Sequence, residues 1–200
     1  MAGIGLVLAL VFTAFKGNDM LPIGAEAPMM KYEMQDALTG ERHHLAGLKK
    51  ENGLLVIFSC NTCPFVLAWE ETYPGLGEYT RENNIGMVLV NSNEAKRKGE
   101  DSREAMQEHY KQGSYNTPYV IDEGHQLADA FGAKTTPHVF LFNSDMELVY
   151  RGSINDKFEE RDKKADVFYL DNALKAMLDD APVNPAETRE IGCSIKRVKS

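Results

Sequence analysis

The chain has 200 residues, of which 43% are hydrophobic, so it is long enough for one domain with an ordinary core. Thirty acidic residues against 22 basic ones give a formal net charge of −8, which argues against nucleic acid as a partner. Three cysteines are too few for a disulfide-stapled mini-protein, and their odd number leaves one thiol outside any intramolecular pair.

The N-terminal segment, residues 1–20, contains an uncharged apolar run from Ile4 to Phe15. This run is shorter than the roughly 20 residues that a helix needs to cross a bilayer. Its length suits a secretory signal, although no Lys or Arg precedes it and no clean cleavage site follows it. It is either a buried element of the fold or a signal for export or membrane tethering, and we favour the second. The expected location is a periplasm-like compartment, or the cytoplasm if these residues are not a signal.

Strand and helix patterns alternate through residues 21–180, which we take as one domain. Leu54–Phe58 is continuously apolar, which is typical of a strand buried on both faces. The later elements expected in chain order are a helix over 65–83 that Pro74 and Gly75 kink or divide, a strand over 86–90, a helix over 102–112, a strand over 119–121, a helix over 125–131 stopped by Gly132, a hairpin of strands over 138–142 and 147–151, and a helix over 167–178. This alternation predicts an α/β fold with a mixed, mostly parallel central sheet covered on both faces and a closing β-hairpin.

Two segments carry no element pattern. The charged run Asp156–Asp166 is predicted to be a solvated loop or a helix start, because its charges are of mixed sign. Residues 181–200 contain two prolines and no sustained apolar periodicity, so they are predicted to form an extended tail that carries Cys193.

Cys60 and Cys63 form a Cys-x-x-Cys motif directly after the apolar strand. In α/β sheets, chemistry gathers where strands end and helices begin. The free N–H groups and the dipole of a helix start stabilise a thiolate, which predicts Cys60 as the nucleophile. Cys63, one turn further on and expected to be more buried, would then attack the mixed disulfide that Cys60 forms. The motif therefore indicates dithiol–disulfide exchange.

Three other interpretations of the cysteines stay open. A structural metal site would need two more ligands, but there is no second cysteine pair and the five histidines are scattered. A metal-carrying module could combine Cys60 and Cys63 with a histidine such as His138 to bind Cu(I) or Zn(II). The other interpretation is a pair of inert, buried thiols.

A second motif, Thr136-Pro137, precedes the apolar strand at 138–142. Proline cannot donate to a ladder, so it belongs at a strand's first residue or at an edge. Because X-Pro bonds can be cis, we predict a cis Thr136–Pro137 peptide, with an ordinary trans proline as the alternative.

The order of these motifs resembles the thioredoxin superfamily over Glu26 to Asp179. The segments FSCNTCPF, VNSNEA, TPYVID, TTPHVFLF and TREIGCSIK are most similar to its redoxin branch, called peroxiredoxin-like and related to alkyl hydroperoxide reductase. The resemblance implies a thioredoxin-like three-layer α/β/α sandwich. It also implies that Cys60 is the nucleophile, Cys63 the resolving thiol and Pro137 a cis-proline that faces them.

The chain departs from these families at several positions. Thioredoxins carry an acidic residue in the strand before the motif, whereas Leu54–Phe58 is apolar, so Glu94 is the candidate proton acceptor for Cys63, with a solvated loop carboxylate as the alternative. Peroxiredoxins have the motif Pro-x-x-x-Thr-x-x-Cys. If its cysteine is aligned with Cys63, Val56 falls at the position of the proline and Cys60 at the position of the threonine. Peroxiredoxins also use a distant arginine to polarise the peroxide; Arg151, on the hairpin, is a candidate for it, but we interpret it as a surface strand arginine. These departures argue against efficient peroxidase activity.

Cys193 lies in the tail motif GCSIK. Three roles stay open: a mixed disulfide with Cys60, a bridge to another chain, or packing as a small hydrophobe.

The leading hypothesis is a thiol–disulfide oxidoreductase that exchanges Cys60 and Cys63 between dithiol and disulfide with a disulfide-containing protein or a small thiol. The Thr136–Pro137 loop would hold the substrate backbone, an electron-donor protein would complete the cycle, and no bound cofactor is needed. Peroxide reduction is the second hypothesis and the metal-carrying module the third.

Overall fold

The computed structural model describes residues 19–160 and 163–198, so the predicted signal or anchor at Ile4–Phe15 lies outside the described residues. The helices are α1 (Leu45–Leu48), α2 (Pro64–Trp69), α3 (Tyr73–Glu82), α4 (Arg103–Gln112), α5 (Gln126–Phe131) and α6 (Tyr169–Leu178). The strands are β1 (Met34–Asp36), β2 (Arg42–His43), β3 (Leu54–Ser59), β4 (Gly86–Asn91), β5 (Tyr119–Ile121), β6 (Thr135–Thr136), β7 (His138–Phe142), β8 (Leu148–Gly152) and β9 (Cys193–Ser194). Within the described ranges, no helix has the length and apolar character needed to span a membrane.

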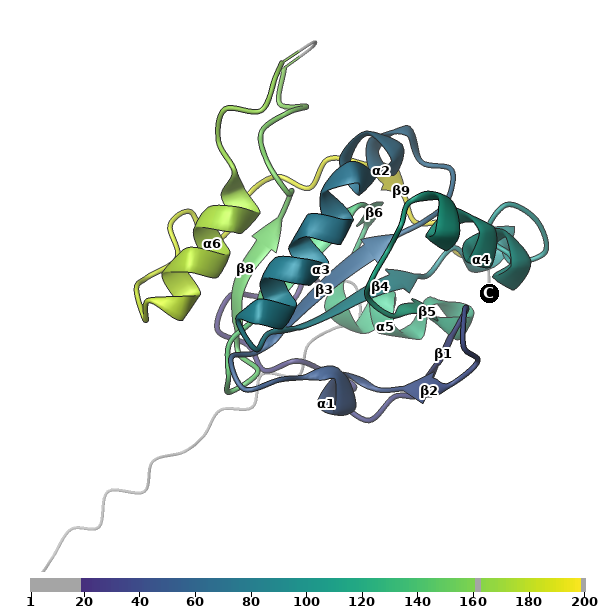
Figure 1. Cartoon of the computed structure of the whole chain (residues 1–200), viewed down its shortest axis with the longest axis horizontal. Coiled ribbons are helices and arrows are strands. Elements are labelled where there is room, and N and C mark those ends of the chain that lie inside the picture. The colour runs from purple at the N-terminus through teal and green to yellow at the C-terminus, as the bar shows by residue number, and fades with distance from the viewer. Residues whose placement is uncertain (1–18, 161–162, 199–200) are drawn as a thin grey trace, which may run out of the picture.

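A seven-stranded sheet in the order β2-β1-β5-β4-β3-β7-β8 runs through the molecule (Figure 1). β3, β4 and β5 pair in parallel, whereas the four pairings that involve β1, β2, β7 and β8 are antiparallel. The sheet is therefore mixed, as predicted, but the expectation that it is mostly parallel is wrong for the described residues. The sequence pattern missed β1 and β2 because strands of three and two residues are too short to show a period.

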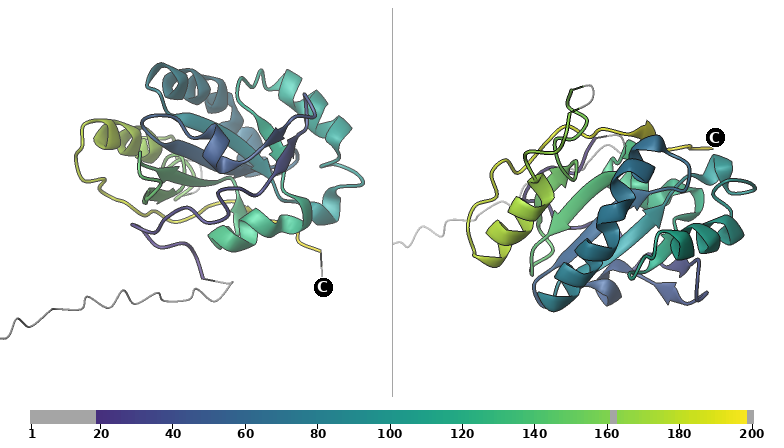
Figure 2. Two further views of the ribbon diagram at one scale, coloured as in Figure 1. Left: turned by 90° about the horizontal axis from the view of Figure 1, so that it is seen from below. Right: turned by 45° about the horizontal axis from the view of Figure 1, so that its top comes forward.

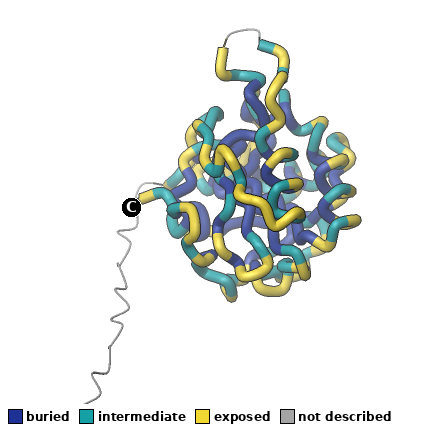
Figure 3. The backbone as a smooth tube through the Cα atoms, turned by 90° about the vertical axis from the view of Figure 1, so that its left-hand side faces the viewer, coloured by how far each residue is buried: buried dark blue, intermediate teal, exposed yellow. Residues whose placement is uncertain are grey.

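β3 lies in the interior and faces two apolar layers. All six of its residues are buried, and they alternate between the two core clusters, with Leu55 and Ile57 in one and Val56 and Phe58 in the other. Helices α2, α3, α4 and α6 contribute to the first cluster, and α1 and α5 to the second. The result is the predicted helix–sheet–helix sandwich, seen from two further sides in Figure 2, with buried residues inside and exposed ones outside in Figure 3.

The helical segment after the cysteine motif divides earlier than predicted. A 3-10 turn over Glu70–Thr72 separates α2 from α3, and Pro74 lies in the first turn of α3 rather than at the break. Proline fits there because first-turn N–H groups have no partner within the helix. The predicted start of α4 is confirmed, because the Ser102 Oγ accepts the Ala105 N–H at 3.2 Å.

The charged run at 156–166 is anchored rather than simply solvated. Asp156 is buried, lies 2.8 Å from the Lys163 Nζ and accepts the N–H groups of Asp166 and Val167. A carboxylate with three such partners tolerates burial, which the sequence pattern did not predict.

The C-terminal tail is extended and returns along the sheet edge to the end of β3. The Arg151 and Thr188 N–H groups bond to the carbonyls of Ala186 and Arg151, and β9 then pairs antiparallel with β6. In Figure 1, β9 lies beside β6, close to α2. The tail therefore ends next to the Cys-x-x-Cys motif.

Candidate functional site

The Cys-x-x-Cys motif occupies the junction that the sequence predicts. Cys60 follows β3 directly, and β3 is flanked by β4 and β7. Cys63 is the N-cap of α2, which begins at Pro64, and its carbonyl accepts the first helical bond, from Leu67 N–H at 3.0 Å. The helix start, with its free N–H groups, therefore faces Cys63 rather than Cys60.

Thr136 contacts both sulfurs. The Cys60 Sγ lies 3.1 Å from the Thr136 Oγ1, and the Cys63 thiol donates to the Thr136 carbonyl oxygen, also at 3.1 Å. The Thr136–Pro137 peptide is cis, as the sequence predicts. Four of the expected site residues therefore lie together, from segments more than 70 positions apart in the chain.

Both thiols are nearly inaccessible. Cys60 is 2% exposed and Cys63 is 3% exposed, so Cys63 is not the more buried of the two, in contrast to the sequence expectation. A cavity of about 80 Å³ opens onto them. Its lining residues are Cys60, Thr62, Cys63, Asn93, Lys96, Thr136, Cys193, Ser194 and Lys196.

Cys63 is the more acidic thiol. Its pKa is lowered to about 5, because the neighbouring Cys60 and Cys193 groups and the Val66 N–H at the helix start stabilise the thiolate. Burial of the Cys63 sulfur opposes this shift in its pKa.

The pKa of Cys60 is raised. Its proton is held toward Cys63, its sulfur is buried, and the Asp101 carboxylate disfavours a second negative charge nearby. The sequence assigned the stabilised thiolate to Cys60 because it assumed that the helix began at the first cysteine. The structure starts the helix at Pro64 and so favours the thiolate at Cys63.

A buried carboxylate that the sequence did not single out supports the motif. Asp101 is fully buried and its oxygens accept the Asn61 N–H at 3.0 Å and the side-chain amides of Asn91 and Asn93 at 2.8 and 2.9 Å. Asn61 lies between the two cysteines, so Asp101 fixes the turn that holds them. Nothing in the local sequence around Asp101 marks it, because its role depends on strands brought together by the fold.

Glu94, the predicted proton acceptor, lies elsewhere. Its carboxylate accepts the Gly124 N–H at 3.2 Å and lies 3.6 Å from the Arg97 guanidinium. It does not line the cavity at the cysteines, so Asp101 is the acidic group that the structure brings to this site.

Arg151 also differs from its prediction. Its side chain is only 12% exposed, lies 2.7 Å from the Glu187 carboxylate and donates to the Leu21 carbonyl. Arg151 is therefore partly buried and connects β8 to the tail and to the N-terminal segment, so it is not a surface strand arginine.

Cys193 lies beside the pair. It is paired in register with Thr136, lines the same cavity and is partly exposed. All three cysteines are free thiols. The structure thus adds to the predicted motif a third thiol, from a segment that the sequence described only as a tail.

The residues proposed for a metal-carrying module do not form a cluster. Within the described residues there is no group of three or more His, Cys, Asp or Glu side chains placed to hold a metal ion. His138 is buried, with its ring centroid 4.5 Å from that of Phe140.

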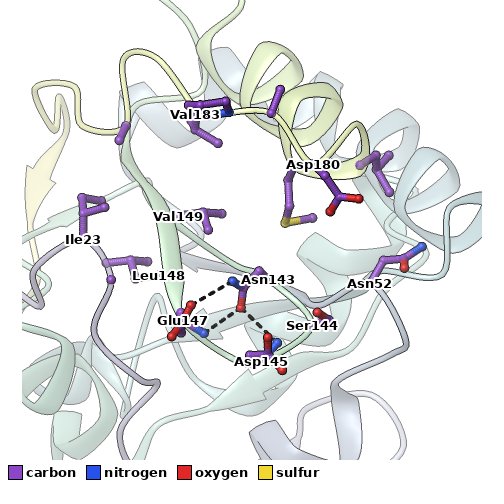
Figure 4. Close-up of a pocket in the computed structure, with 16 residues that line it drawn as sticks. Ile23, Asn52, Asn143, Ser144, Asp145, Glu147, Leu148, Val149, Asp180 and Val183 are labelled. Carbon is purple, nitrogen blue, oxygen red and sulfur yellow. Dashed lines mark hydrogen bonds between the residues drawn. The ribbon is translucent and has the colours of Figure 1, made fainter.

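A larger cavity, of about 540 Å³, lies at the other end of the sheet. It is bordered by the β7–β8 turn, where Phe142 pairs with the first residue of β3, and by the end of α6. Figure 4 shows Asn143 bonded to Glu147 and Asp145 along its floor. None of the three cysteines lines this cavity, so it is separate from the thiol site.

Comparison with known proteins gives the family. A model of the AhpC/TSA family matches residues 23–151. The chain belongs to the AhpC/TSA family. The match covers the cysteine motif, the cis-proline and the hairpin, and it leaves the tail with Cys193 outside.

Solved structures share the fold of this AhpC/TSA family member. A conserved protein of Geobacillus kaustophilus, described as uncharacterized, is 31% identical with a TM-score of 0.84, over 91% of this chain and 95% of that one. Peroxidoxin BcpB of Mycobacterium tuberculosis is 15% identical with a TM-score of 0.57, over 80% and 96% of the two chains. A secreted disulfide oxidoreductase of the same organism is 11% identical with a TM-score of 0.55, over 76% and 96%. No curated protein matches the chain significantly. The predicted thioredoxin-like redoxin fold is confirmed.

Proposed function

We propose that the protein is a thiol–disulfide oxidoreductase that cycles Cys60 and Cys63 between dithiol and disulfide. The observation that carries the proposal is the pairing of an acidic thiol, Cys63, with a protonated one, Cys60, both in contact with Thr136 beside the cis-proline. A thiolate is needed to attack a disulfide, and a second thiol is needed to resolve the product.

In the proposed reaction, the Cys63 thiolate attacks one sulfur of a substrate disulfide. A bond forms between Cys63 and that sulfur, and the second substrate sulfur leaves as a thiolate that takes a proton from water. Cys60 then loses its proton and attacks Cys63, which forms the Cys60–Cys63 disulfide and releases the first substrate sulfur. The substrate gains two electrons and the protein loses two.

This order of attack reverses the roles that the sequence suggests for the two cysteines. The place of Cys63 at the start of α2 supports it, because the Val66 N–H acts to lower the pKa of Cys63. The Asp101 carboxylate supports it as well, because it disfavours charge on Cys60.

The partners proposed are a disulfide-containing protein or a small thiol as substrate and an electron-donor protein as the other half of the cycle. The small cavity supports a partner that presents a disulfide at the surface, next to Thr136. Export or tethering through residues 4–15 is part of the proposal and would require a donor in that compartment. The proposed cycle uses no cofactor other than the cysteine pair.

The test is the reduction potential of the Cys60–Cys63 couple. The Cys193→Ser variant, which contains only these two thiols, is equilibrated in graded dithiol and glutathione buffers, and free thiols are counted by alkylation and mass. We expect a single two-electron transition, which Cys63→Ser abolishes in the same background. A potential near about −270 mV would indicate a reductant, and one closer to about −120 mV an oxidant. Two thiols that stay free across the whole buffer range would refute the proposal.

Peroxide reduction is a second candidate, because a peroxidoxin shares the fold and the pKa of Cys63 is lowered. Its test is the rate at which Cys63 is lost to hydroperoxide alone. Val56 and Cys60 occupy the positions at which peroxiredoxins have Pro and Thr. Arg151, the candidate for the arginine of that family, forms an ion pair with Glu187. We therefore expect a rate close to that of a free thiolate of the same pKa.

A further inference from the structure

The tail brings a third thiol to the cysteine pair by specific contacts. The β6–β9 ladder pairs Thr135 with Ser194 and Thr136 with Cys193. Thr136 is also the residue that contacts both Cys60 and Cys63. The strand that carries Cys193 is therefore hydrogen-bonded to the strand that touches the other two sulfurs.

The residues just after Cys193 fix its position. The Ile195 N–H bonds to the Lys134 carbonyl at 2.9 Å, and the Ile195 side chain is 5% exposed within the second core cluster. The Lys196 N–H bonds to the Asn93 Oδ1 at 2.8 Å, and the amide of Asn93 is itself held by Asp101. The carboxylate that fixes the motif thus also helps to hold the tail.

Gly192 allows the tail to approach this closely. A Cβ at this position would lie 2.3 Å from the Thr136 carbonyl oxygen, so a larger residue would push the strand away. The same oxygen accepts the bond from the Cys63 thiol. The backbone beside Cys193 therefore packs directly on the atom that contacts Cys63.

All three cysteines line the same small cavity, and Cys193 is paired in register with Thr136, whose carbonyl oxygen accepts a bond from the Cys63 thiol. Both Cys60 and Cys193 also act to lower the pKa of Cys63. A single sulfur with two thiol neighbours can form a disulfide with either.

We propose that Cys193 is a third redox-active thiol, which converts the Cys60–Cys63 disulfide into a Cys63–Cys193 disulfide by exchange at the Cys63 sulfur. The inference rests on the proposed disulfide cycle of Cys60 and Cys63. In the exchange step, Cys193 loses its proton and attacks Cys63, the Cys63–Cys193 bond forms, and the Cys60–Cys63 bond breaks. Cys60 leaves as a thiolate and takes up one proton. One disulfide replaces another, so the step needs no outside oxidant or reductant.

The exchange moves the disulfide toward the surface. Cys60 is 2% exposed, whereas Cys193 is partly exposed. Burial and the neighbouring Cys63 raise the pKa of Cys193 to about 11, and the charge of Lys196 acts in the opposite direction. An electron donor would then attack Cys193 at the surface rather than Cys60 in the interior. Substrate and donor would use different sulfurs of one three-thiol site.

The test uses the Cys60→Ser variant, in which Cys63 and Cys193 are the two remaining thiols. The folded protein is equilibrated with oxidised and reduced glutathione, quenched with alkylating agent and digested with trypsin. Cleavage after Lys50, Arg81, Arg189 and Lys196 releases Cys63 and Cys193 on separate peptides, so a cross-linked peptide pair reports their disulfide. We expect the effective concentration of the two thiols to be at least about a hundredfold higher in the folded chain than in urea.

Two glycine substitutions in the Cys60→Ser background test whether the close packing of the tail on Thr136 is what brings Cys193 to Cys63. Gly192→Ala keeps both thiols but drives a Cβ into the Thr136 carbonyl, and we expect the effective concentration to fall at least about tenfold. Gly75→Ala is the matched control, because a Cβ there meets nothing within 4 Å, and we expect no change.

The outcomes distinguish this inference from the proposed function. If Cys60→Ser keeps both thiols free in buffers that oxidise the Cys60–Cys63 pair in Cys193→Ser, the third thiol is not redox-active and the inference is wrong, while the proposed function stands. If Cys193→Ser forms no couple, the proposed function itself fails. If Cys60→Ser does not fold, the wild-type chain is equilibrated and digested in the same way. We then expect the cross-linked peptide pair, with its bond located at Cys63 by fragmentation, and an oxidised chain without this pair would overturn the inference.

Discussion

At the scale of single residues, the two thiols of the motif differ because their surroundings differ. Cys63 lies at the N-terminal end of α2, where the Val66 N–H acts to lower its pKa, whereas the Asp101 carboxylate acts to raise the pKa of Cys60. Partial positive charge at a helix start favours a thiolate, and a nearby carboxylate disfavours one. In the proposed reaction, the choice of Cys63 as the attacking sulfur therefore depends on where the helix begins, a boundary that a sequence pattern fixes only within a few residues.

The acidity of Cys63 can be measured directly. In the reduced protein we expect thiolate absorbance to appear with a midpoint near pH 5, because the pKa of Cys63 is lowered to about 5 from the usual value of about 8.5. Below this pH the group is a thiol, and above it a thiolate. Brief alkylation at pH 6 to 7, followed by peptide fragmentation, should find the label on Cys63 rather than Cys60.

A pair of variants at Cys60 provides the control. Serine retains a hydroxyl that can donate to the Cys63 sulfur, whereas alanine removes the donor, which is the first contribution to the low pKa. The midpoint should therefore rise more in Cys60→Ala than in Cys60→Ser. Label that appears first on Cys60 in the wild-type protein would contradict the assignment.

At the scale of elements, the residues nearest in sequence determine where α4 begins and where α5 ends. Ser102 caps α4, and Gly132 ends α5 with a φ of +62°. At Gly132, tertiary structure adds a second requirement, because a Cβ there would lie 2.4 Å from the Asp19 carbonyl oxygen and 2.5 Å from the Met20 Cα. The glycine thus permits both the left-handed cap and the close approach of the N-terminal segment.

Gly132→Ala is expected to lower the free energy of unfolding by about 2 to 4 kcal/mol, as measured by urea denaturation. Gly124→Ala is the matched control, because Gly124 has a similar φ of +63° and its Cβ would meet only the Gln126 Cγ, at 4.0 Å. That variant should lose only about 1 kcal/mol, from backbone strain alone. Equal losses at the two positions would mean that the contact with Asp19 and Met20 contributes nothing.

At the scale of the whole molecule, burial changes how stability depends on pH. His138 is fully buried behind the cis-proline, and neither ring nitrogen has a hydrogen-bond partner among the described residues. Burial lowers its pKa to about 3, and the charges of Arg151 and Lys134 act in the same direction. His138 is therefore neutral in the folded protein well below the pH at which it protonates in the unfolded chain.

The free energy of unfolding should consequently fall as the pH drops from about 6.5 toward 3. Between these values the unfolded chain binds one more proton at this residue, so the loss is about 1.4 kcal/mol per pH unit and about 2 kcal/mol between pH 7 and pH 5. Other groups titrate in the same range, so the comparison is with His138→Leu, whose stability should fall less steeply by this amount. Parallel pH profiles for the two proteins would show that His138 is not buried as a neutral group.

The sequence alone determined the features that local chemistry encodes. The apolar run of β3, the Cys-x-x-Cys motif after it and the Ser102 cap are each visible within a few neighbouring residues. The cis Thr136–Pro137 peptide was predicted from the Thr-Pro motif together with its spacing from the cysteines. Their order along the chain was enough to indicate a thioredoxin-like fold and disulfide chemistry.

Only the tertiary structure decided which groups surround the sulfurs. Asp101 and Cys193 reach the motif from segments separated from it by dozens of residues, and β9 is too short to show a pattern. The expected carboxylate, Glu94, was wrong because its side chain pairs with Arg97 and Gly124 instead. The acidity of a thiol and the approach of a third one depend on distances through space, which the fold sets and the spacing of residues along the chain does not.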